Sequence, residues 1–173
     1  MDDPRLPLEH PANAALLAYF RSLERTARDV AEHPGYESCD PAEVPLEDVW
    51  LGAHPDVLTQ MRGPVAAKLP EPCHWVVLGI PVLAHPHTGV IFAWAGGMDY
   101  ALRLPRDELS AALRAGARQV YHARANQWTG TPAWTLDLRD IGPDWCFGHY
   151  RAEEAEWCLS AFHAAATGWH SPA

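Results

Sequence analysis

The feature that most constrains the fold is a series of apolar runs and turns in the middle of the chain. Residues 75–83 are almost continuously apolar, and residues 90–94 form a second apolar run. In residues 100–104, large apolar side chains alternate with other residues, which is typical of a strand with one exposed face. Turns that contain glycine, at 85–89 and 96–97, separate the three segments. The pattern predicts a three-stranded antiparallel meander whose first two strands are covered on both faces.

Helical periodicity marks both ends of the chain. Apolar side chains recur every three or four positions between residues 11 and 33, with charged residues on the opposite face. Residues 152–167 show similar spacing, and glutamates occupy their first turns, where the helix dipole favours negative charge. Shorter helices are expected at residues 55–69, with an interruption at Gly63-Pro64, and from a cap at Asp107 to an end at Gly116.

The remaining segments complete the prediction of an α+β fold. Residues 118–123 and 134–139 are expected to form further strands, and residues 143–148 a loop. We therefore expect an antiparallel sheet, made of a three-stranded meander plus one or two further strands, packed by N- and C-terminal helices. No repeat or long linker divides the chain, so residues 1–173 are expected to form a single domain.

The charge balance argues against several classes of partner. The chain has 13 basic and 22 acidic residues, a formal net charge of −9. Lys68 is the single lysine and the arginines are scattered, so we expect no binding to nucleic acid or to an anionic membrane. The first residues lack the basic and apolar regions of a signal peptide, and no apolar stretch is long enough to cross a membrane. These features predict a cytoplasmic protein with reduced thiols.

The middle of the chain resembles domains of small bacterial families. A helix leads into the sequence HWVVLGIPVLAHPHTGVIFAWAGGMDYALRLP. Its order of strand, turn, Gly-x-apolar-Phe-Ala, glycine turn and YALRLP, over residues 57–105, is similar to the TfoX N-terminal and YdhG-like domains. The resemblance implies a small sheet packed by helices in a bacterial protein. Those families carry no catalytic motif to transfer, so it implies no reaction.

Several residues could bind a metal ion, but their spacing argues against it. Cys146 and His149, followed by Cys158 and His163, are residue types that bind zinc. The second pair is five residues apart on an expected helix, so its side chains point in different directions. The two histidines of the 85–89 turn are more typical of a solvated turn than of a metal site. We therefore predict no metal site and no cofactor.

Nothing in the sequence indicates a catalytic site. Cys39 lies in a polar segment, and no residue near it in sequence would act as its base. The chain contains no GxSxG, HExxH, P-loop or GxGxxG motif. Lack of catalytic activity is therefore the favoured interpretation, and no residue is assigned a catalytic role.

Two acidic clusters suggest a binding surface. One comprises Glu37, Asp40, Glu43, Glu47 and Asp48. The other comprises Asp137, Asp140 and Asp144, which we expect on one exposed edge with Trp134 or Trp145 close by. Solvated acidic faces are common, but acidic residues beside tryptophans also occur at protein interfaces. The predicted partner-binding residues are therefore Trp134, Asp137, Asp140, Asp144 and Trp145.

Two functional hypotheses from different classes follow. The first is a non-enzymatic binding protein, such as an immunity protein or antitoxin that neutralises a basic toxin through this acidic, tryptophan-bearing surface. The alternative is a small-molecule-binding protein or small enzyme with a pocket between sheet and helices. A deep cavity lined by Trp75, Trp94 and His149 would favour the alternative, and a flat acidic face would favour the first hypothesis.

Overall fold

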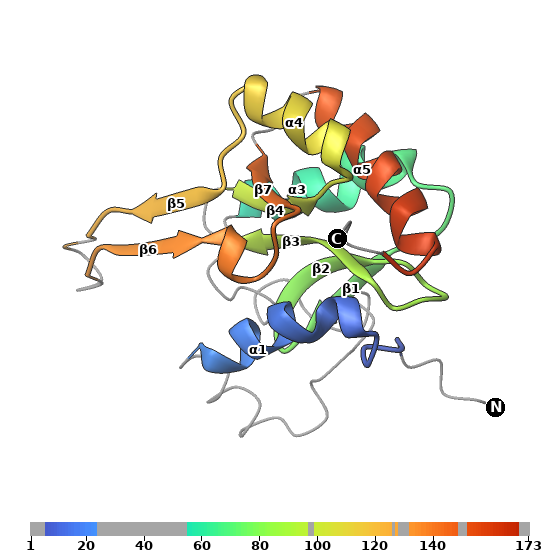
Figure 1. Ribbon diagram of the computed structural model, residues 1–173, viewed down its shortest axis with the longest axis horizontal. Helices are drawn as coiled ribbons and strands as arrows, with labels where there is room; N and C mark the ends of the chain where they lie inside the picture. The colour runs from blue at the N-terminus through green and yellow to red at the C-terminus, as the bar shows by residue number, and fades with distance from the viewer. Residues whose placement is uncertain are drawn as a thin grey trace.

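A computed structural model describes most of the chain, namely residues 6–23, 55–96, 99–125, 127, 132–148 and 152–169. Its centre is a five-stranded antiparallel sheet with helices on both faces, and a two-stranded ribbon extends from one side (Figure 1). This arrangement confirms the predicted α+β class with N- and C-terminal helices. In spatial order the strands of the sheet are β1 (His74–Val77), β2 (Ile80–Ala84), β3 (Ile91–Gly96), β4 (Asp99–Arg103) and β7 (Trp145–Gly148).

The first apolar run forms two strands instead of one. Leu78 and Gly79 connect β1 to β2 with φ values of 51° and 75°, and positive φ at both central residues is typical of a type I′ hairpin turn. Val77 pairs with Ile80 across this turn. The meander therefore has four strands. The sequence analysis missed the turn because Leu78 is apolar and does not resemble the usual turn residues.

Strand β4 is buried on both faces, so the expectation of one exposed face is wrong. Tyr100 and Leu102 pack into the core on one side of the sheet and Ala101 into the core on the other. None of the three is more than 1% exposed. The strand is internal because β7 pairs along its outer edge. The segment expected as a loop before Gly148 contains that fifth strand.

The two further strands predicted from the sequence exist, but they lie outside the main sheet. They are β5 (Val120–Ala123) and β6 (Trp134–Asp137), and they pair with each other in a two-stranded antiparallel ribbon. After β4 the chain forms helix α4 (Arg106–Arg114), then the ribbon, and then returns to the sheet as β7. The ribbon is therefore an excursion between two neighbouring strands.

Helix α1 (Ala14–Ser22) covers one face of the sheet, and a 3-10 turn (Pro11–Asn13) precedes it. The helix ends at Ser22, because Leu23 is extended with a ψ of 122°. Ser22 Oγ donates a hydrogen bond of 2.6 Å to the carbonyl of Tyr19, and such a local bond competes with helical backbone bonding. The predicted helix is thus shorter at this end, and residues 24–33 lie outside the described residues.

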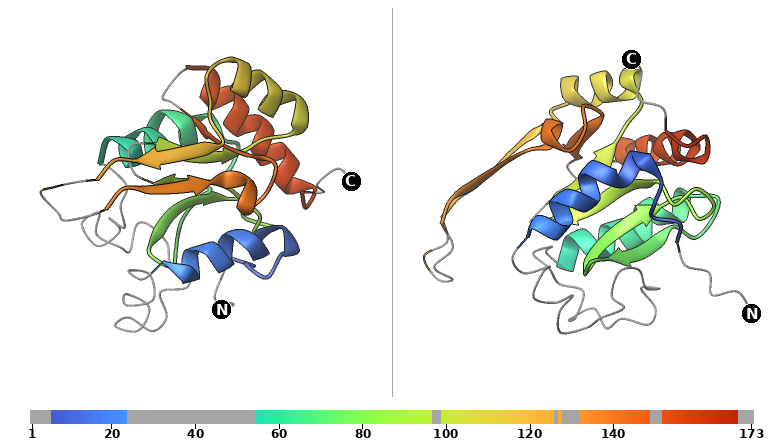
Figure 2. Two further views of the ribbon diagram at one scale, coloured as in Figure 1. Left: turned by 60° about the vertical axis from the view of Figure 1, so that its left-hand side comes forward. Right: turned by 60° about the horizontal axis from the view of Figure 1, so that its bottom comes forward.

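The opposite face of the sheet carries the other helices (Figure 2). Helix α5 (Ala152–Ala166) agrees with the predicted C-terminal helix. Helix α3 (Pro55–Gln60) continues through a π turn (Met61–Val65) into a 3-10 turn (Ala66–Lys68). Pro64 therefore widens the helix locally, whereas the sequence suggested an interruption.

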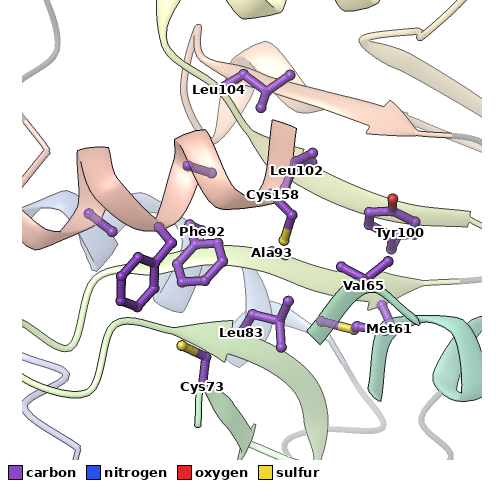
Figure 3. Packing of buried hydrophobic residues seen from close by; sticks show 14 of the residues in the cluster. Met61, Val65, Cys73, Leu83, Phe92, Ala93, Tyr100, Leu102, Leu104 and Cys158 are labelled. Carbon is purple, nitrogen blue, oxygen red and sulfur yellow. The ribbon is translucent and has the colours of Figure 1, made fainter. Parts of the chain in front are cut away.

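Each face of the sheet has its own core. On the α5 side, Leu83, Phe92 and Leu102 of the sheet meet Met61 of the π turn and Cys158 of α5 (Figure 3). None of these five is more than 1% exposed. Complete burial of a side chain such as Leu, Phe or Met contributes roughly 1.5–3 kcal/mol each. Because both faces of the sheet are packed, the sequences of its strands are almost continuously apolar.

On the α1 side, Phe20 is the central anchor of the helix. Its ring packs edge-on against Trp94 of β3, with 5.5 Å between ring centroids. Asn13 fixes the start of the helix to the sheet, because its amide donates to the carbonyl of Gly89 at 2.8 Å and accepts from the backbone of Ile91 at 2.9 Å. This buried amide aligns α1 with β3.

Candidate binding surface

The five residues that were predicted to bind a partner do not all lie on one exposed edge. Asp144 and Trp145 are 6% and 1% exposed, so the expectation that Asp144 lies on an exposed edge is wrong. Asp140 is exposed and Asp137 half-buried, both near the base of the ribbon. Trp134 lies in β6, and its side chain is outside the described part of the structure. No single acidic, tryptophan-bearing edge therefore unites these residues.

Asp144 is buried because it faces a buried cation. Arg103 of β4 approaches its carboxylate, with 3.8 Å between Nη2 and Oδ2, and both side chains are less than 10% exposed. Trp169, just beyond α5, donates its indole N–H to the same Oδ2 at 3.1 Å. Arg103 also donates to the carbonyl of Ala12 at 3.0 Å. The cluster joins four separate parts of the chain.

Two indole rings complete the surroundings of the guanidinium. The Cζ atom of Arg103 lies 4.6 Å from the ring centroid of Trp169 and 5.8 Å from that of Trp145, which are distances of cation–π contact. Burial lowers the pKa of Arg103 to about 10, and the charge of Asp144 opposes that shift. The guanidinium therefore stays charged at neutral pH. This cluster holds the N-terminal segment, β4, β7 and the end of α5 together.

The ribbon has a firmly anchored base. Arg118 exchanges two backbone hydrogen bonds with Phe147 of β7, at 3.2 and 2.6 Å. The side chain of Gln119 donates to the carbonyls of Pro143 and Trp145, at 3.1 and 3.0 Å. Tyr121 packs on the ring of Phe147 with 5.2 Å between centroids. Strand β5 thus starts as a neighbour of β7 and then leaves the sheet.

Beyond this base the ribbon extends away from the body of the molecule (Figures 1 and 2). In the described part of the chain, β5 and β6 pair only with each other past the Arg118–Phe147 bridge. Leu138 donates its backbone N–H to the carbonyl oxygen of Gln119 at 2.8 Å, so residues 119 and 138 are a hydrogen-bonded pair of the antiparallel ladder. By alternation, the backbone groups of His122 and Thr135 point to the outer edges of the two strands.

Asp137 is engaged within its own loop. Its carboxylate accepts hydrogen bonds from the backbone N–H and the Nε of Arg139, at 3.0 and 2.8 Å. The side-chain hydrogen bond from Arg139 is the main cause that lowers the pKa of Asp137 to about 2. Arg139 already balances the negative charge of Asp137, so this carboxylate would attract a basic partner less strongly.

The described structure instead reveals a basic strip that the sequence analysis overlooked. Residues 109–136 contain three arginines and no Asp or Glu, a formal charge of +3, which leaves −12 for the rest of a chain whose total is −9. Arg114 lies at the end of α4, Arg118 at the base of the ribbon, His122 on β5 and Arg124 just after it. All four are exposed. We call these four residues the basic strip; the long interval without acidic residues was the signal in the sequence.

The histidine turn after β2 is only partly solvated. His87 is exposed, as expected, but His85 is 5% exposed and packs on Phe162 of α5 with 4.7 Å between ring centroids. Nδ1 of His85 accepts the backbone N–H groups of His87 and Thr88, both at 3.3 Å. Burial and the neighbouring His87 lower the pKa of His85, while Glu71 opposes the shift. His85 is therefore a structural residue of the core.

The cysteines of the candidate metal site are buried, whereas His163 is exposed. Among the described residues, no three His, Cys, Asp or Glu side chains are grouped so that they could hold a metal ion. Cys73, Cys146 and Cys158 are buried thiols. Burial, with a contribution from Glu71, raises the pKa of Cys73 to about 12, which makes a thiolate there unfavourable. His149, Cys39 and the acidic cluster at residues 37–48 lie outside the described residues.

A row of aromatic residues lies across the α1 face of the sheet. Trp75 pairs with Val82, Val82 with Trp94, Trp94 with Ala101 and Ala101 with Phe147, so all five belong to one transverse row. The indole nitrogens of Trp75 and Trp94 are buried, and neither has a hydrogen-bond acceptor in the described part of the chain. A buried donor without an acceptor costs about 1–3 kcal/mol.

Comparisons with family models, with curated proteins and with solved structures found no match to the chain. The resemblance of residues 57–105 to TfoX N-terminal and YdhG-like domains therefore stays a prediction. The helices of the described residues include none with the length and apolar character needed to cross a membrane.

Proposed function

We propose that this chain is a non-enzymatic binding protein and that the β5–β6 ribbon is its binding element. The observation that supports this most is the extension of an anchored two-stranded ribbon beyond the body, with outer edges that no described strand covers. An isolated two-stranded hairpin is at best marginally stable in water. A partner that added a strand to either edge would supply the missing hydrogen bonds.

The mode of binding that fits this geometry is strand addition. Main-chain hydrogen bonds from the partner would provide affinity, and side chains on the ribbon would provide specificity. The base is held by Gln119, Tyr121 and the Arg118–Phe147 bridge, so the first part of the ribbon needs little ordering on binding. This mode requires no catalytic group, which agrees with the favoured interpretation of the sequence.

An immunity or antitoxin role remains one form of this proposal. The net charge of −9 would attract a basic toxin from a distance. The residues first assigned to that contact support it less well, because Asp144 is paired with Arg103 and Asp137 with Arg139. Three residues of the basic strip lie on the ribbon or at its ends, so direct contact through the ribbon is better suited to an acidic surface.

The experiment is a comparison of two proline variants. His122→Pro removes the outward N–H of β5, and Thr135→Pro removes the outward N–H of β6. Both variants lose the same side-chain contact of 3.0 Å between His122 and Thr135, so each is the matched control for the other. Circular dichroism and thermal melting would verify that both variants fold.

The readout is recovery of binding partners from a lysate of the native host by the tagged full-length chain. Strand addition predicts that one proline variant loses a specific partner at least tenfold more than the other. Equal recovery by the wild type and both variants would overturn the ribbon as the binding element, as would recovery of no macromolecule.

A second candidate function is supported by the two buried indole N–H groups. A small molecule with hydrogen-bond acceptors, bound between α1 and the sheet, would satisfy Trp75 and Trp94. Tyr19 of α1 lies beside this site, with its ring 6.0 Å from that of Trp94. This candidate corresponds to the alternative hypothesis of a small-molecule-binding protein.

Native mass spectrometry of the purified chain tests this candidate. A co-purifying small molecule should be present in the wild type and depleted in Trp75→Phe and Trp94→Phe, which lack the indole donors. Trp157→Phe is the control, because Trp157 packs on the opposite core. A bound mass that is unchanged in both test variants, or absent from the wild type, would rule out this ligand site.

A further inference from the structure

We propose that the strand that adds to the ribbon is a short acidic segment of another protein, and that it pairs with the outer edge of β5. Its carboxylates occur at every second position and face Arg118, His122 and Arg124. This inference rests on the proposed function, because it assigns the chemistry of the partner and the edge at which it binds. The backbone of β5 indicates the edge, and the charge of its side chains indicates the partner.

At its base, the outer edge of β5 already pairs with the main sheet. Arg118 exchanges two backbone hydrogen bonds with Phe147 of β7, so the backbone groups of Arg118 point to this edge. By alternation, the backbone groups of His122 point to the same edge, and no described strand pairs with them there. Because the ribbon leaves the body beyond its base (Figure 2), an added strand would continue the pairing that the Arg118–Phe147 bridge begins.

The side chains along this edge belong to the basic strip. Arg118 and His122 are four positions apart, so strand alternation places both side chains on one face of the ribbon. Tyr121 lies on the opposite face, where it packs on Phe147. Arg124 comes directly after the strand, and it is exposed, as are Arg118 and His122. A strand added to this edge would therefore run beside these three side chains.

The repeat of a strand determines the spacing of the acidic residues in the partner. Each residue of a strand advances about 3.3 Å, so side chains on one face recur about every 7 Å. An added strand has the same repeat, and opposite charges that face each other across a ladder stabilise the pairing. Arginine can form two parallel hydrogen bonds to one carboxylate, which makes it well suited to this contact. Carboxylates at every second position of the partner would thus all lie on the cationic face.

Charge also favours an acidic peptide over a nucleic acid as the partner. Residues 109–136 contain no Asp or Glu that could neutralise the strip, and Asp137 of the ribbon is bound to Arg139. The net charge of −9 repels a long polyanion such as a nucleic acid. A segment with few carboxylates is repelled less, and it gains a ladder of main-chain hydrogen bonds that a nucleic acid cannot form. The strip and the open edge together therefore fit a short acidic strand.

The test is the binding of two labelled synthetic peptides to the full-length chain, measured by fluorescence anisotropy at low salt, where exposed charges are least screened. In one peptide glutamates alternate with threonines, and in the other the same residues form a block of glutamates followed by a block of threonines. The wild type should bind the alternating peptide at least tenfold more tightly, because only its carboxylates all lie on one face of a strand.

Two pairs of variants assign this affinity to the strip and to the edge. Arg118→Gln combined with Arg124→Gln should weaken binding of the alternating peptide at least tenfold. The control combines Arg21→Gln with Arg106→Gln, two exposed arginines outside the strip, and should change binding less than twofold. His122→Pro, which removes the outward N–H of β5, should weaken binding at least tenfold more than the matched change in β6, Thr135→Pro. Circular dichroism verifies that each variant folds.

The outcomes distinguish this inference from the proposed function. The inference is overturned if the alternating peptide does not bind, if both peptides bind equally, or if either pair of variants shows equal losses. Tighter, strip-dependent binding of an oligothymidylate would overturn it in favour of a nucleic acid. In each of these cases, edge-specific capture of a host protein would still support the ribbon as a binding element. Preference for the alternating peptide that depends on both the strip and β5 supports both proposals.

Discussion

Replacement of Asp144 by Asn tests whether the buried cluster around Arg103 holds the fold together. The substitution keeps the size of the side chain and an oxygen that can accept the Trp169 indole N–H. It removes the negative charge that faces the guanidinium across 3.8 Å, in a place where both side chains are less than 10% exposed. The variant therefore leaves Arg103 charged, buried and without its anionic partner.

The magnitude follows from the cost of an uncompensated buried charge. Removal of one partner from a buried ion pair destabilises a protein by about 3–5 kcal/mol. The contact is long for a direct hydrogen bond, and the rings of Trp145 and Trp169 continue to stabilise the cation. We therefore expect the lower end, about 3 kcal/mol, which is a large share of the stability of a typical domain.

Urea denaturation monitored by circular dichroism measures this loss. The midpoint should fall while the slope of the transition stays constant. In the background Arg103→Met, which removes the cation, Asp144→Asn should cost much less, with a coupling of about 1–3 kcal/mol. Asp137→Asn is the control, because Asp137 forms its ion pair with Arg139 at the surface. The reasoning would be refuted if Asp144→Asn and Asp137→Asn shifted the midpoint equally.

Three further predictions concern the histidine turn, a buried thiol and a tight approach of the backbone. Because burial lowers the pKa of His85, its neutral form contributes to the free energy of unfolding fully above pH about 6.5, and this contribution is lost as the pH falls. The urea midpoint of His85→Gln should therefore depend less on pH than that of the wild type. Cys73, with a pKa of about 12, should resist iodoacetamide at pH 8 in the native state and react in urea, as peptide mapping can show; labelling of the folded protein would contradict its burial. Gly89→Ala should lose about 1–3 kcal/mol from positive φ alone, and more because a Cβ would stand 1.9 Å from the carbonyl oxygen of Pro7; an unchanged melting temperature would contradict this.

The sequence predicted the positions of the strands better than it predicted which strands pair with each other. The sequence predicted strands at the positions of β5 and β6, the second from alternation, yet only the structure showed that they form a separate ribbon. Strand β7 was missed because it is four residues long and ends in a glycine, which together with Pro143 suggested a loop. Pairing between β4 and β7 joins residues 42 to 48 positions apart, and local periodicity holds no information on such contacts.

In the candidate site too, the local sequence did not determine which side chains are exposed. Asp144 and Trp145 follow a Gly-Pro turn, which locally favours exposure, and nothing near them in sequence indicates that Arg103 lies opposite. The basic strip could have been found, because residues 109–136 lack acidic residues. The scattered arginines of the whole chain and its negative net charge obscure this local excess of positive charge.

The sequence by itself determined the class of the fold, because helical and strand periods follow from which side chains must leave water. It also determined the overall charge and the uneven distribution of that charge along the chain. Only the tertiary structure decided which polar side chains face solvent, since burial depends on neighbours that are distant in sequence. It buried Asp144 beside Arg103, and it left the basic strip exposed, from Arg114 at the end of α4 to Arg124 just after β5. A charged side chain can be buried only where another part of the chain supplies its counterpart, and that meeting is a property of the fold.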